Sequence, residues 1–448
     1  MKINRIERHM SHAQIMALGF FLVIVIGTAI LMLPISSKNG VWTDPFTALF
    51  TAASATCVTG LVVVDTYQYW SVFGQVIILG MIQIGGLGFI TLGVLFSMFL
   101  KKRIGLDRRN LIQESVSSMH LSGVVKLVRK IVKGTFILEA AGAVLLSLRF
   151  IPDMGVVEGI YNGIFHSISA FCNAGFDLMG KYEAYTSLTV YYNDLVVNVT
   201  VMVLIIMGGL GFVVWEELKE NKFHFRKYSL HAKIVLVTTS VLIAGGAILY
   251  WLFERNHLMQ GMQPYEKVIT SLFASVTART AGYNTIDLGA MTQASKLLTV
   301  ILMFIGGSPG STAGGIKTTT LVVIIVYIWS NIRNASGCNI FGRRIGDEDI
   351  KKASMVIGLN LVLAVTAMML ISAVQVFEVE DLMLEVFSAI GTVGLSTGIT
   401  RQLNLFSKLV IILLMYCGRI GSMTFALSFA YKKESAPVLY PEERINVG

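Results

Sequence analysis

The chain has 448 residues, of which 54% are hydrophobic and 14% charged, and its formal net charge is +9. A soluble domain carries roughly 25% charged residues, so this composition excludes an ordinary soluble protein and indicates an integral membrane protein. The positive charge lies in short runs between apolar segments, which is typical of membrane orientation and not of nucleic-acid binding. The four cysteines form no CxxC pair, so they predict neither a zinc site nor a disulfide framework.

The chain contains eight long apolar runs. A helix needs about 20 apolar residues to cross a bilayer, and runs of that kind lie at 13–34, 70–100, 128–150, 191–215, 231–253, 294–329, 353–377 and 404–431. The first run is long enough to span and ends at Pro34, so it is interpreted as a retained helix and not as a signal peptide.

A shorter apolar stretch separates the two members of each pair of runs. These stretches are too short to span and too apolar for an ordinary loop, which favours re-entrant half-helices at Asp44–Ala55, Glu158–Ala170, Pro264–Thr277 and Asp381–Ala389. Each is followed by a small glycine motif, at Val58–Leu61, Asn173–Phe176, Thr280–Tyr283 and Thr392–Leu395. A second glycine motif follows inside the next long run, at Gly85–Gly88, Gly208–Gly211, Gly306–Pro309 and Gly418–Gly421.

These matching landmarks predict four repeats in one polypeptide. The fold class is an all-α integral membrane protein with four helix–half-helix–filter–helix repeats, which makes eight spans and four re-entrant pore helices with pseudo-fourfold symmetry around one pore. The predicted boundaries are 1–108, 109–222, 223–342 and 343–436, followed by a C-terminal tail at 437–448. Basic runs at 2–8, 101–133, 219–233 and 333–352 lie on one side. The positive-inside rule makes that side of the plasma membrane cytoplasmic, together with both termini.

The four glycine motifs predict a potassium site. Non-helical backbone inside a membrane survives only where it is packed in protein or lines a wet cavity, and a ring of backbone carbonyls there replaces the hydration shell of K⁺. Glycine reaches the positive φ that such a strand needs. The predicted filter residues that bind K⁺ are Val58, Thr59, Gly60, Asn173, Ala174, Gly175, Thr280, Ala281, Gly282, Thr392, Val393 and Gly394. Two interpretations stay open for the hydroxyls near them, extra oxygen ligands or packing behind the filter: Thr56, Thr59, Thr277, Thr280 and Thr392.

A cluster of glycine and proline interrupts the sixth apolar run. It consists of Gly306, Gly307, Ser308, Pro309, Gly310, Ser311, Thr312, Ala313, Gly314 and Gly315. Such residues destabilise a helix by about 1 to 3 kcal/mol each, so the helix is expected to break below the filter and the segment to act as a gate. A packing kink that never moves is the alternative. A phosphate-binding loop is excluded because Ile316 separates Gly315 from Lys317.

Three basic residues lie in apolar surroundings. Arg419 replaces the second glycine of its motif, and we expect it to raise the barrier for cations leaving the filter or to pair with residues 306–315, with snorkelling as the alternative. Lys317, also assigned to the gate, is near enough to the inner end to snorkel. Arg279 is expected to turn away from the pore and brace the filter against Glu266 or Asp287.

The motifs resemble the Trk/Ktr/HKT superfamily of potassium transporters over nearly the whole chain. The resemblance is carried by Ala55–Gly60, Phe171–Phe176, Thr277–Tyr283 and Gly306–Lys317, and Thr392–Leu395 resembles the TVGYG filter of potassium channels with its end changed. No extra helix pair precedes the first repeat, which makes the chain most similar to Ktr-type membrane subunits.

The resemblance implies potassium uptake by a homodimer, with one pore in each protomer, docked on a cytosolic ring of nucleotide-binding regulatory subunits (KtrA-like). It also implies that Na⁺ often stimulates uptake, and Gly60 in place of serine favours K⁺. We expect no bound cofactor, membrane lipids but no nucleic acid as further partners, and no enzymatic activity, since the seven histidines are scattered and only His166 lies near the pore. The alternative is a sodium- or mixed-cation secondary transporter of the same fold.

Overall fold

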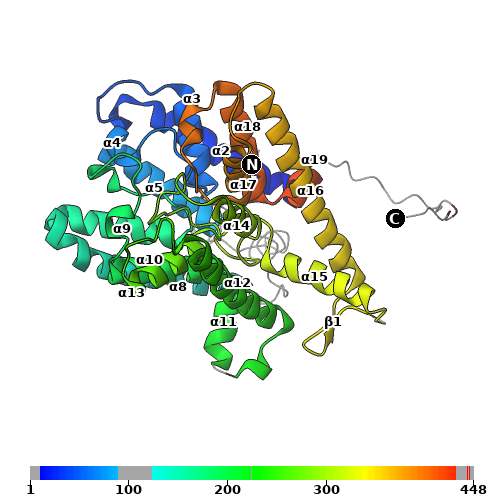
Figure 1. Cartoon of the computed structure of the whole chain (residues 1–448). Coiled ribbons are helices and arrows are strands. Elements are labelled where there is room, and N and C mark those ends of the chain that lie inside the picture. Colours follow the sequence, from blue (N-terminus) through cyan, green and yellow to red (C-terminus); the bar gives the residue numbers. More distant parts are fainter. Residues whose placement is uncertain are drawn as a thin grey trace.

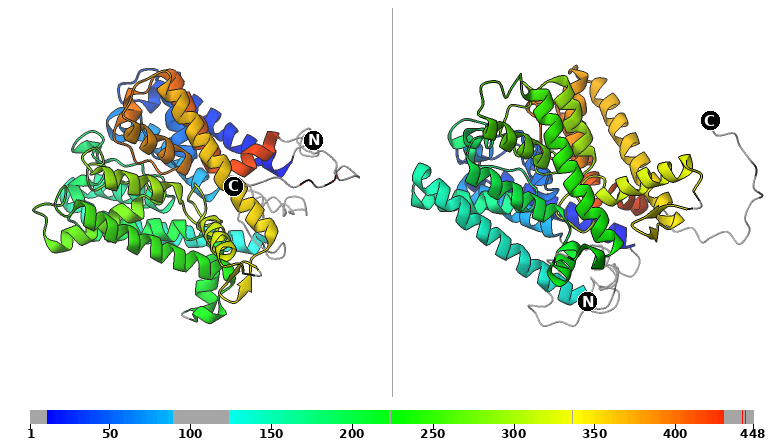
Figure 2. Two further views of the ribbon diagram at one scale, coloured as in Figure 1. Left: turned by 45° about the vertical axis from the view of Figure 1, so that its right-hand side comes forward. Right: turned by 60° about the horizontal axis from the view of Figure 1, so that its bottom comes forward.

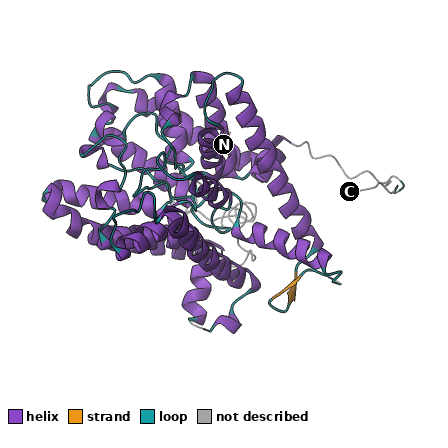
Figure 3. Cartoon of the chain, viewed as in Figure 1, coloured by secondary structure: helices purple, strands orange, loops and turns teal. Residues whose placement is uncertain are grey.

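The computed structural model describes residues 11–88, 124–222, 224–335 and 337–429, together with Pro441 and Glu443. This part of the chain is almost entirely helical (Figure 3). Its one sheet is an antiparallel pair, β1 (Asn339–Ile340) and β2 (Arg343–Arg344). The predictions made for residues 2–8, most of the 101–133 linker and most of the 437–448 tail lie outside the described residues.

The helices follow one another in four units of similar order, in which a long helix precedes a short helix and one or two further helices. Unit 1 contains α2 (His12–Met32), α3 (Pro45–Thr56), α4 (Thr66–Tyr69) and α5 (Val72–Leu87). Unit 2 contains α8 (Val124–Met154), α9 (Val156–Phe171), α10 (Leu195–Gly209) and α11 (Phe212–Asn221). Unit 3 contains α12 (Leu230–Glu254), α13 (Pro264–Thr277), α14 (Gln293–Phe304) and α15 (Thr318–Ile332). Unit 4 contains α16 (Asp347–Ser372), α17 (Val379–Gly391), α18 (Leu405–Ile420) and α19 (Ser422–Phe429).

Single turns of 3₁₀ helix occur in the connections: η1 (Pro34–Ser36), η2 (Met179–Lys181), η3 (Thr189–Tyr191), η4 (Phe225–Lys227) and η5 (Ile399–Gln402). One helix in each unit follows the loop after the short helix, and these helices, hereafter the third helices, are α5, α10, α14 and α18. All four begin in the same way. In each, the N-cap side chain accepts a hydrogen bond from the backbone N–H three residues later, and these caps are Ser71, Asp194, Thr292 and Asn404. A side-chain cap of this kind satisfies one of the free donors of a helix start, so each connection ends at a defined residue.

The units close into a ring around a common centre, where their loops converge (Figures 1 and 2). The third helix of each unit packs against the short helix of the next, in the pairs α5–α9, α10–α13 and α14–α17, and α18 of unit 4 returns to α3 of unit 1. This closed order is what the predicted pseudo-fourfold arrangement requires.

Four helices of the described chain are long and apolar enough to cross a membrane, at Ala13–Met32, Val125–Met154, Leu230–Glu254 and Asp347–Ser372. Each is the first helix of its unit. Two further candidates are pairs bent by 100°, α10 with α11 and α18 with α19, and α5, α14 and α15 are shorter apolar helices. The described residues therefore contain up to six candidate spans, fewer than the eight expected from sequence.

One expectation about the third helices is wrong. The sequence placed the second glycine motif inside a continuous helix in units 1, 2 and 4, but the helix ends there in each case. The last glycine of each motif has a positive φ, +80° for Gly88, +92° for Gly211 and +95° for Gly421. A right-handed helix cannot continue through such a residue. The interruption is therefore not confined to residues 306–315.

Candidate functional site

The backbone after each short helix alternates in handedness. The glycine of each first motif and the residue two positions before it have positive φ, in the pairs Val58 and Gly60 (+56° and +91°), Asn173 and Gly175 (+58° and +66°), Thr280 and Gly282 (+77° and +81°), and Thr392 and Gly394 (+51° and +95°). The residue between them does not. In an ordinary strand successive carbonyls point to opposite sides, whereas alternating left- and right-handed residues turn them to the same side. Four chain segments therefore share one unusual conformation.

The four glycines contact one another in a closed ring, hereafter the glycine ring. A Cβ on Gly60 would lie 2.5 Å from the carbonyl oxygen of Ala174, and one on Gly175 would lie 2.7 Å from that of Ala281. A Cβ on Gly282 or Gly394 would come closer still to the carbonyl oxygen of the next unit. These two oxygens belong to Val393 and Thr59. Each position therefore requires glycine for two reasons, its positive φ and the close approach of the neighbouring carbonyl.

Backbone hydrogen bonds attach each segment to the end of its own short helix. The N–H of the residue before the ring glycine donates to a carbonyl near the end of the helix over 2.8–2.9 Å, in the pairs Thr59–Ser54, Ala174–Ser169, Ala281–Thr277 and Val393–Ser388. The side-chain hydroxyls of the same helix residues also bind the segment, and sequence reasoning singled out Thr277 but missed the three serines. These serines lie six positions before the glycine, a regularity that the sequence does contain.

These hydroxyls act in two ways. Ser54 and Ser388 accept hydrogen bonds from the N–H groups of Gly60 (3.1 Å) and Gly394 (3.0 Å). Ser169 and Thr277 instead donate to carbonyls one residue beyond the ring glycine, over 2.7 and 2.5 Å. The segments in units 1 and 4 are thus held by their glycine N–H, and those in units 2 and 3 by a carbonyl.

The open question about the threonine hydroxyls has a mixed outcome. Thr277 is bonded as described, and the Thr280 hydroxyl lies 3.1 Å from the Asn173 amide. The other three hydroxyls are buried and have no hydrogen-bond partner among the described residues: Thr56, Thr59 and Thr392. These three hydroxyls make no hydrogen bond to the described residues, so both of their lone pairs are available to a ligand.

A cavity of about 170 Å³ lies against the glycine ring and is lined by residues of all four units. Its lining includes the four ring glycines and two carboxylates, Asp177 and Asp287, and one basic side chain, Arg401, which stacks 4.2 Å from the ring centre of Tyr185. Asp177 accepts a hydrogen bond from the N–H of Met179. Burial, with a further contribution from the nearby Asp65, raises the pKa of Asp177 to about 7.

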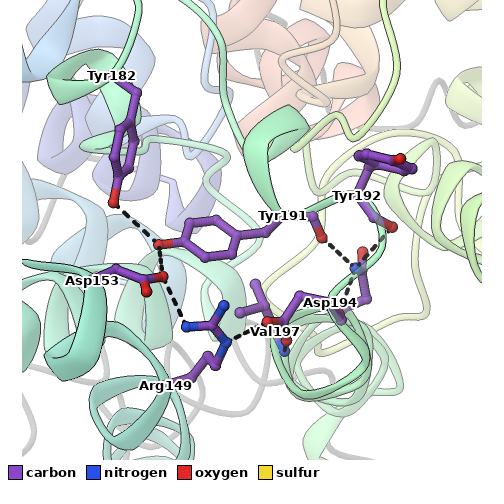
Figure 4. Close-up of polar contacts among 8 residues, drawn as sticks. Arg149, Asp153, Tyr182, Tyr191, Tyr192, Asp194 and Val197 are labelled. Atoms are coloured by element: carbon purple, nitrogen blue, oxygen red, sulfur yellow. Dashed lines mark hydrogen bonds and ion pairs between the residues drawn. The ribbon is translucent and has the colours of Figure 1, made fainter.

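A polar network fixes the loop that carries Asp177 and Tyr185 (Figure 4). The Arg149 guanidinium of α8 donates to Asp153 over 2.8 Å and also to Asp194, the N-cap of α10. The Tyr191 hydroxyl donates to Asp153 over 3.0 Å and lies 3.4 Å from that of Tyr182. The C-terminal part of the loop is thus tied to α8 and to the start of α10.

On the opposite side of the glycine ring, the second glycine motifs pack against the ends of the short helices. Gly85, Gly208 and Gly418 lie so close to the last carbonyls of the short helices that none has space for a Cβ. In unit 3 the equivalent Gly306 faces Gly314 instead. A different segment therefore fills this place in unit 3.

That segment joins α14 to α15 and forms a loop under the glycine ring. The helix breaks as the sequence predicts, and the loop ends meet where Ile305 pairs with Ile316. The Thr312 hydroxyl donates to the carbonyl of Phe171 over 3.2 Å. The N–H groups of Ser308 and Thr312 donate to carbonyls of the α10 end over 3.0 and 3.1 Å. The loop therefore lies directly below the residues that precede the ring.

Arg419 pairs with this loop, as one of the sequence expectations proposed. Its guanidinium donates to the carbonyls of Thr312, Gly85 (2.5 Å) and Gly86 (3.2 Å). Lys317 does not snorkel, because its ammonium folds back onto the carbonyls of Ala313 (2.7 Å) and Gly314 (3.4 Å). Two cationic groups are thus fixed by backbone carbonyls below the glycine ring.

The expected brace of Arg279 is wrong. Arg279 is buried beside the ring, but it makes no ion pair or hydrogen bond with Glu266 or Asp287 in the described part of the chain. Glu266 accepts the N–H of Gln263 at the start of α13, whereas Arg279 follows the end of that helix, about 20 Å away at 1.5 Å per residue. Asp287 accepts the N–H of Gly289.

Comparison with known proteins gives a consistent match. The family model described as TrkH, cation transport protein, matches residues 3–439. The chain is 41% identical to the potassium/sodium uptake protein NtpJ of Enterococcus hirae, covering 99% of both, and 40% identical to the Ktr system potassium uptake protein B of Bacillus subtilis, covering 97% of this chain and 96% of that protein. The crystal structure of the potassium transporter TrkH from Vibrio parahaemolyticus has the same fold, with a TM-score of 0.75 at 18% identity over 94% of this chain and 86% of that one.

Proposed function

The chain belongs to the TrkH family of cation transport proteins, which are transporters and not enzymes, and we propose that it takes up K⁺ across the plasma membrane through a channel-like pore. The observation that carries the proposal is the closed glycine ring, in which four segments present backbone carbonyls at one level. The uptake pathway runs from the cavity of about 170 Å³, through the ring, to the loop below it.

The four segments form the selectivity filter, and Val58–Gly60, Asn173–Gly175, Thr280–Gly282 and Thr392–Gly394 bind the ion. Carbonyl oxygens replace the water shell of K⁺ in such a ring. The C-terminal ends of α3, α9, α13 and α17 add partial negative charge. These four short helices are re-entrant pore helices. The whole chain has eight spans in four repeats, whose boundaries are 1–108, 109–222, 223–342 and 343–436.

The loop at 306–315 is the gate, held by Arg419 and Lys317. The hydrogen bonds from Arg419 to Thr312 and to Gly85 support this role, because they tie the loop to another unit directly under the filter. A fixed positive charge at this level also opposes the exit of a cation. Displacement of the loop opens the pathway.

The names of the relatives support a place in a multi-subunit system. The Bacillus subtilis relative is named as protein B of a Ktr system. By analogy this chain is the ion-translocating subunit of a homodimer docked on a KtrA-like nucleotide-binding ring, with both termini cytoplasmic. We also propose that Na⁺ stimulates uptake. The name of the Enterococcus hirae relative includes sodium, which supports the second candidate, a sodium- or mixed-cation transporter of the same fold.

Rubidium uptake by the purified chain in liposomes tests the proposal. Uptake of labelled Rb⁺ is measured against rising K⁺ or Na⁺, with Na⁺ varied and with the cytosolic ring present or absent. We expect K⁺ to compete at a concentration at least about tenfold below that of Na⁺, a difference of about 1.4 kcal/mol. Equal competition by both ions favours the mixed-cation transporter, and the absence of any uptake with the ring present contradicts a pore.

A further inference from the structure

The carbonyls one residue beyond the ring glycines are not equivalent. The Phe176 carbonyl of unit 2 accepts two hydrogen bonds, from the hydroxyls of Ser169 (2.7 Å) and Tyr283 (3.0 Å). The Tyr283 carbonyl of unit 3 accepts one from Thr277 (2.5 Å). Ser169 and Thr277 belong to the ends of α9 and α13, so these donors lie behind the filter segments.

The equivalent carbonyls in units 1 and 4 have no such donors among the residues that the structure describes. Those of Leu61 and Leu395 accept no hydrogen bond from the described residues. All four residues are almost fully buried, but both leucines line the cavity against the glycine ring, whereas Phe176 and Tyr283 are not among its lining residues. The two residues that line the cavity are thus the two whose carbonyls have no hydroxyl donor, and the two that do not line it are those whose carbonyls are hydrogen-bonded.

A carbonyl oxygen has two lone pairs, and at Phe176 both are occupied by hydroxyl donors. We infer that Tyr283 and Ser169 hold the Phe176 carbonyl away from the ion pathway, and that Thr277 does the same for the Tyr283 carbonyl. Leu61 and Leu395 then form the outermost coordinating layer. This inference rests on the proposed filter. An entering ion then meets carbonyls on one side and keeps water on the other, and it becomes fully coordinated only at the glycine ring. Tyr283 and Ser169 are positioning residues, because they act through the Phe176 carbonyl.

A buried tyrosine hydroxyl often has only a structural role, and the chain contains a matched example. Tyr250 is also fully buried, and its hydroxyl lies 2.7 Å from that of Thr299, in the contact between α12 and α14. Removing either hydroxyl deletes one buried hydrogen bond and keeps the aromatic ring. Only Tyr283 bonds to the backbone of a filter segment, and that segment belongs to the neighbouring unit.

The test measures the Rb⁺ concentration that gives half-maximal uptake in liposomes. In Tyr283→Phe the Phe176 carbonyl is free to turn toward the ion, so this concentration falls by about twofold to tenfold, the range for one hydrogen bond. Ser169→Ala gives a fall in the same direction. The double variant changes the concentration by less than the product of the two single effects, because both donors bind one oxygen. Tyr250→Phe leaves it unchanged.

An unchanged or raised half-maximal concentration in Tyr283→Phe and Ser169→Ala overturns the inference, as does a multiplicative effect in the double variant. Thermal unfolding of each variant in detergent identifies one that fails to fold, and the other hydroxyl then still tests the same carbonyl. Gly60→Ser distinguishes a refutation of the outer coordinating layer from a refutation of the proposed filter. If it changes ion selectivity while Tyr283→Phe has no effect, only the outer layer is refuted.

Discussion

Replacing Gly60 by serine tests the glycine ring directly. Gly60 has φ +91°, and a Cβ there would lie 2.5 Å from the Ala174 carbonyl oxygen, whereas real Cβ atoms do not come within 3.0 Å of such neighbours. The two atoms must therefore separate by at least about 0.5 Å. That movement displaces one of the four carbonyls that are proposed to face the ion.

The energetic cost has two parts. A side chain in the left-handed region costs about 1–3 kcal/mol, and overpacking adds about 1–3 kcal/mol. The strain is relieved by moving the Ala174 carbonyl, so part of the cost appears as weaker coordination of K⁺. A loss of about 1.4 kcal/mol in discrimination corresponds to a factor of ten, and we expect at least this decrease in the preference for K⁺ over Na⁺.

The assay is the competition of K⁺ and Na⁺ with Rb⁺ uptake in liposomes, and Gly155→Ser is the matched control. Gly155 has a nearly equal φ of +86°, but nothing lies within 4 Å of a Cβ there. The control therefore carries the backbone strain without the clash, and its selectivity stays that of the unaltered protein. Unchanged selectivity in Gly60→Ser, or an equal loss in Gly155→Ser, would refute the role of the ring.

Three further predictions concern the gate and the entrance. Arg419→Ala raises the maximal Rb⁺ uptake rate by about tenfold, because the loop loses hydrogen bonds worth about 1–3 kcal/mol. Arg419→Gln keeps hydrogen-bond donors without the charge and gives a smaller rise. Equal rates in the unaltered protein and both variants contradict the gate. Deleting Ser311–Gly314 also speeds uptake with selectivity unchanged, and slower uptake by a folded variant counts against the loop as a barrier. Asp177 is neutral below its pKa of about 7 and ionises as pH rises, so the half-maximal Rb⁺ concentration falls by about threefold between pH 6 and pH 8. Asp177→Asn removes this pH dependence, and a variant that keeps it would exclude Asp177 as the titrating group.

The short helices were predictable because their causes are local. A stretch such as Pro264–Thr277 is too short to span and too apolar for a loop, and the structure places α13 at the same residues. The predicted Asp44–Ala55 differs from α3 by one residue at each end. The ring glycines could also be predicted from the sequence, since only glycine combines a positive φ with space for a neighbouring backbone.

The contacts between units could not be predicted in the same way. Ser54 and Ser169 occupy equivalent positions, but one accepts a hydrogen bond from its ring glycine and the other donates to the carbonyl of Phe176. That difference depends on peptide orientation, which the sequence pattern does not specify. The helix end at Gly421 was missed for a related reason. The apolar run continues beyond it, and hydropathy does not report the sign of φ.

The residues beneath the glycine ring, including Arg419 and the loop at 306–315, make contacts that revise which units are proposed to control the pathway. The sequence concentrated control in units 3 and 4, because only there is the second glycine motif altered. The contacts distribute it more widely: Arg419 of unit 4 bonds to Gly85 of unit 1 and to Thr312 of unit 3, and Thr312 in turn bonds to Gly208 of unit 2. A movement of the loop therefore breaks contacts with units 2 and 4, and through Arg419 it also affects the contact with unit 1. Such shared contacts favour two discrete arrangements over gradual displacement. If the loop is the gate, as proposed, a substitution in any of these units is expected to alter the balance between its closed and open states.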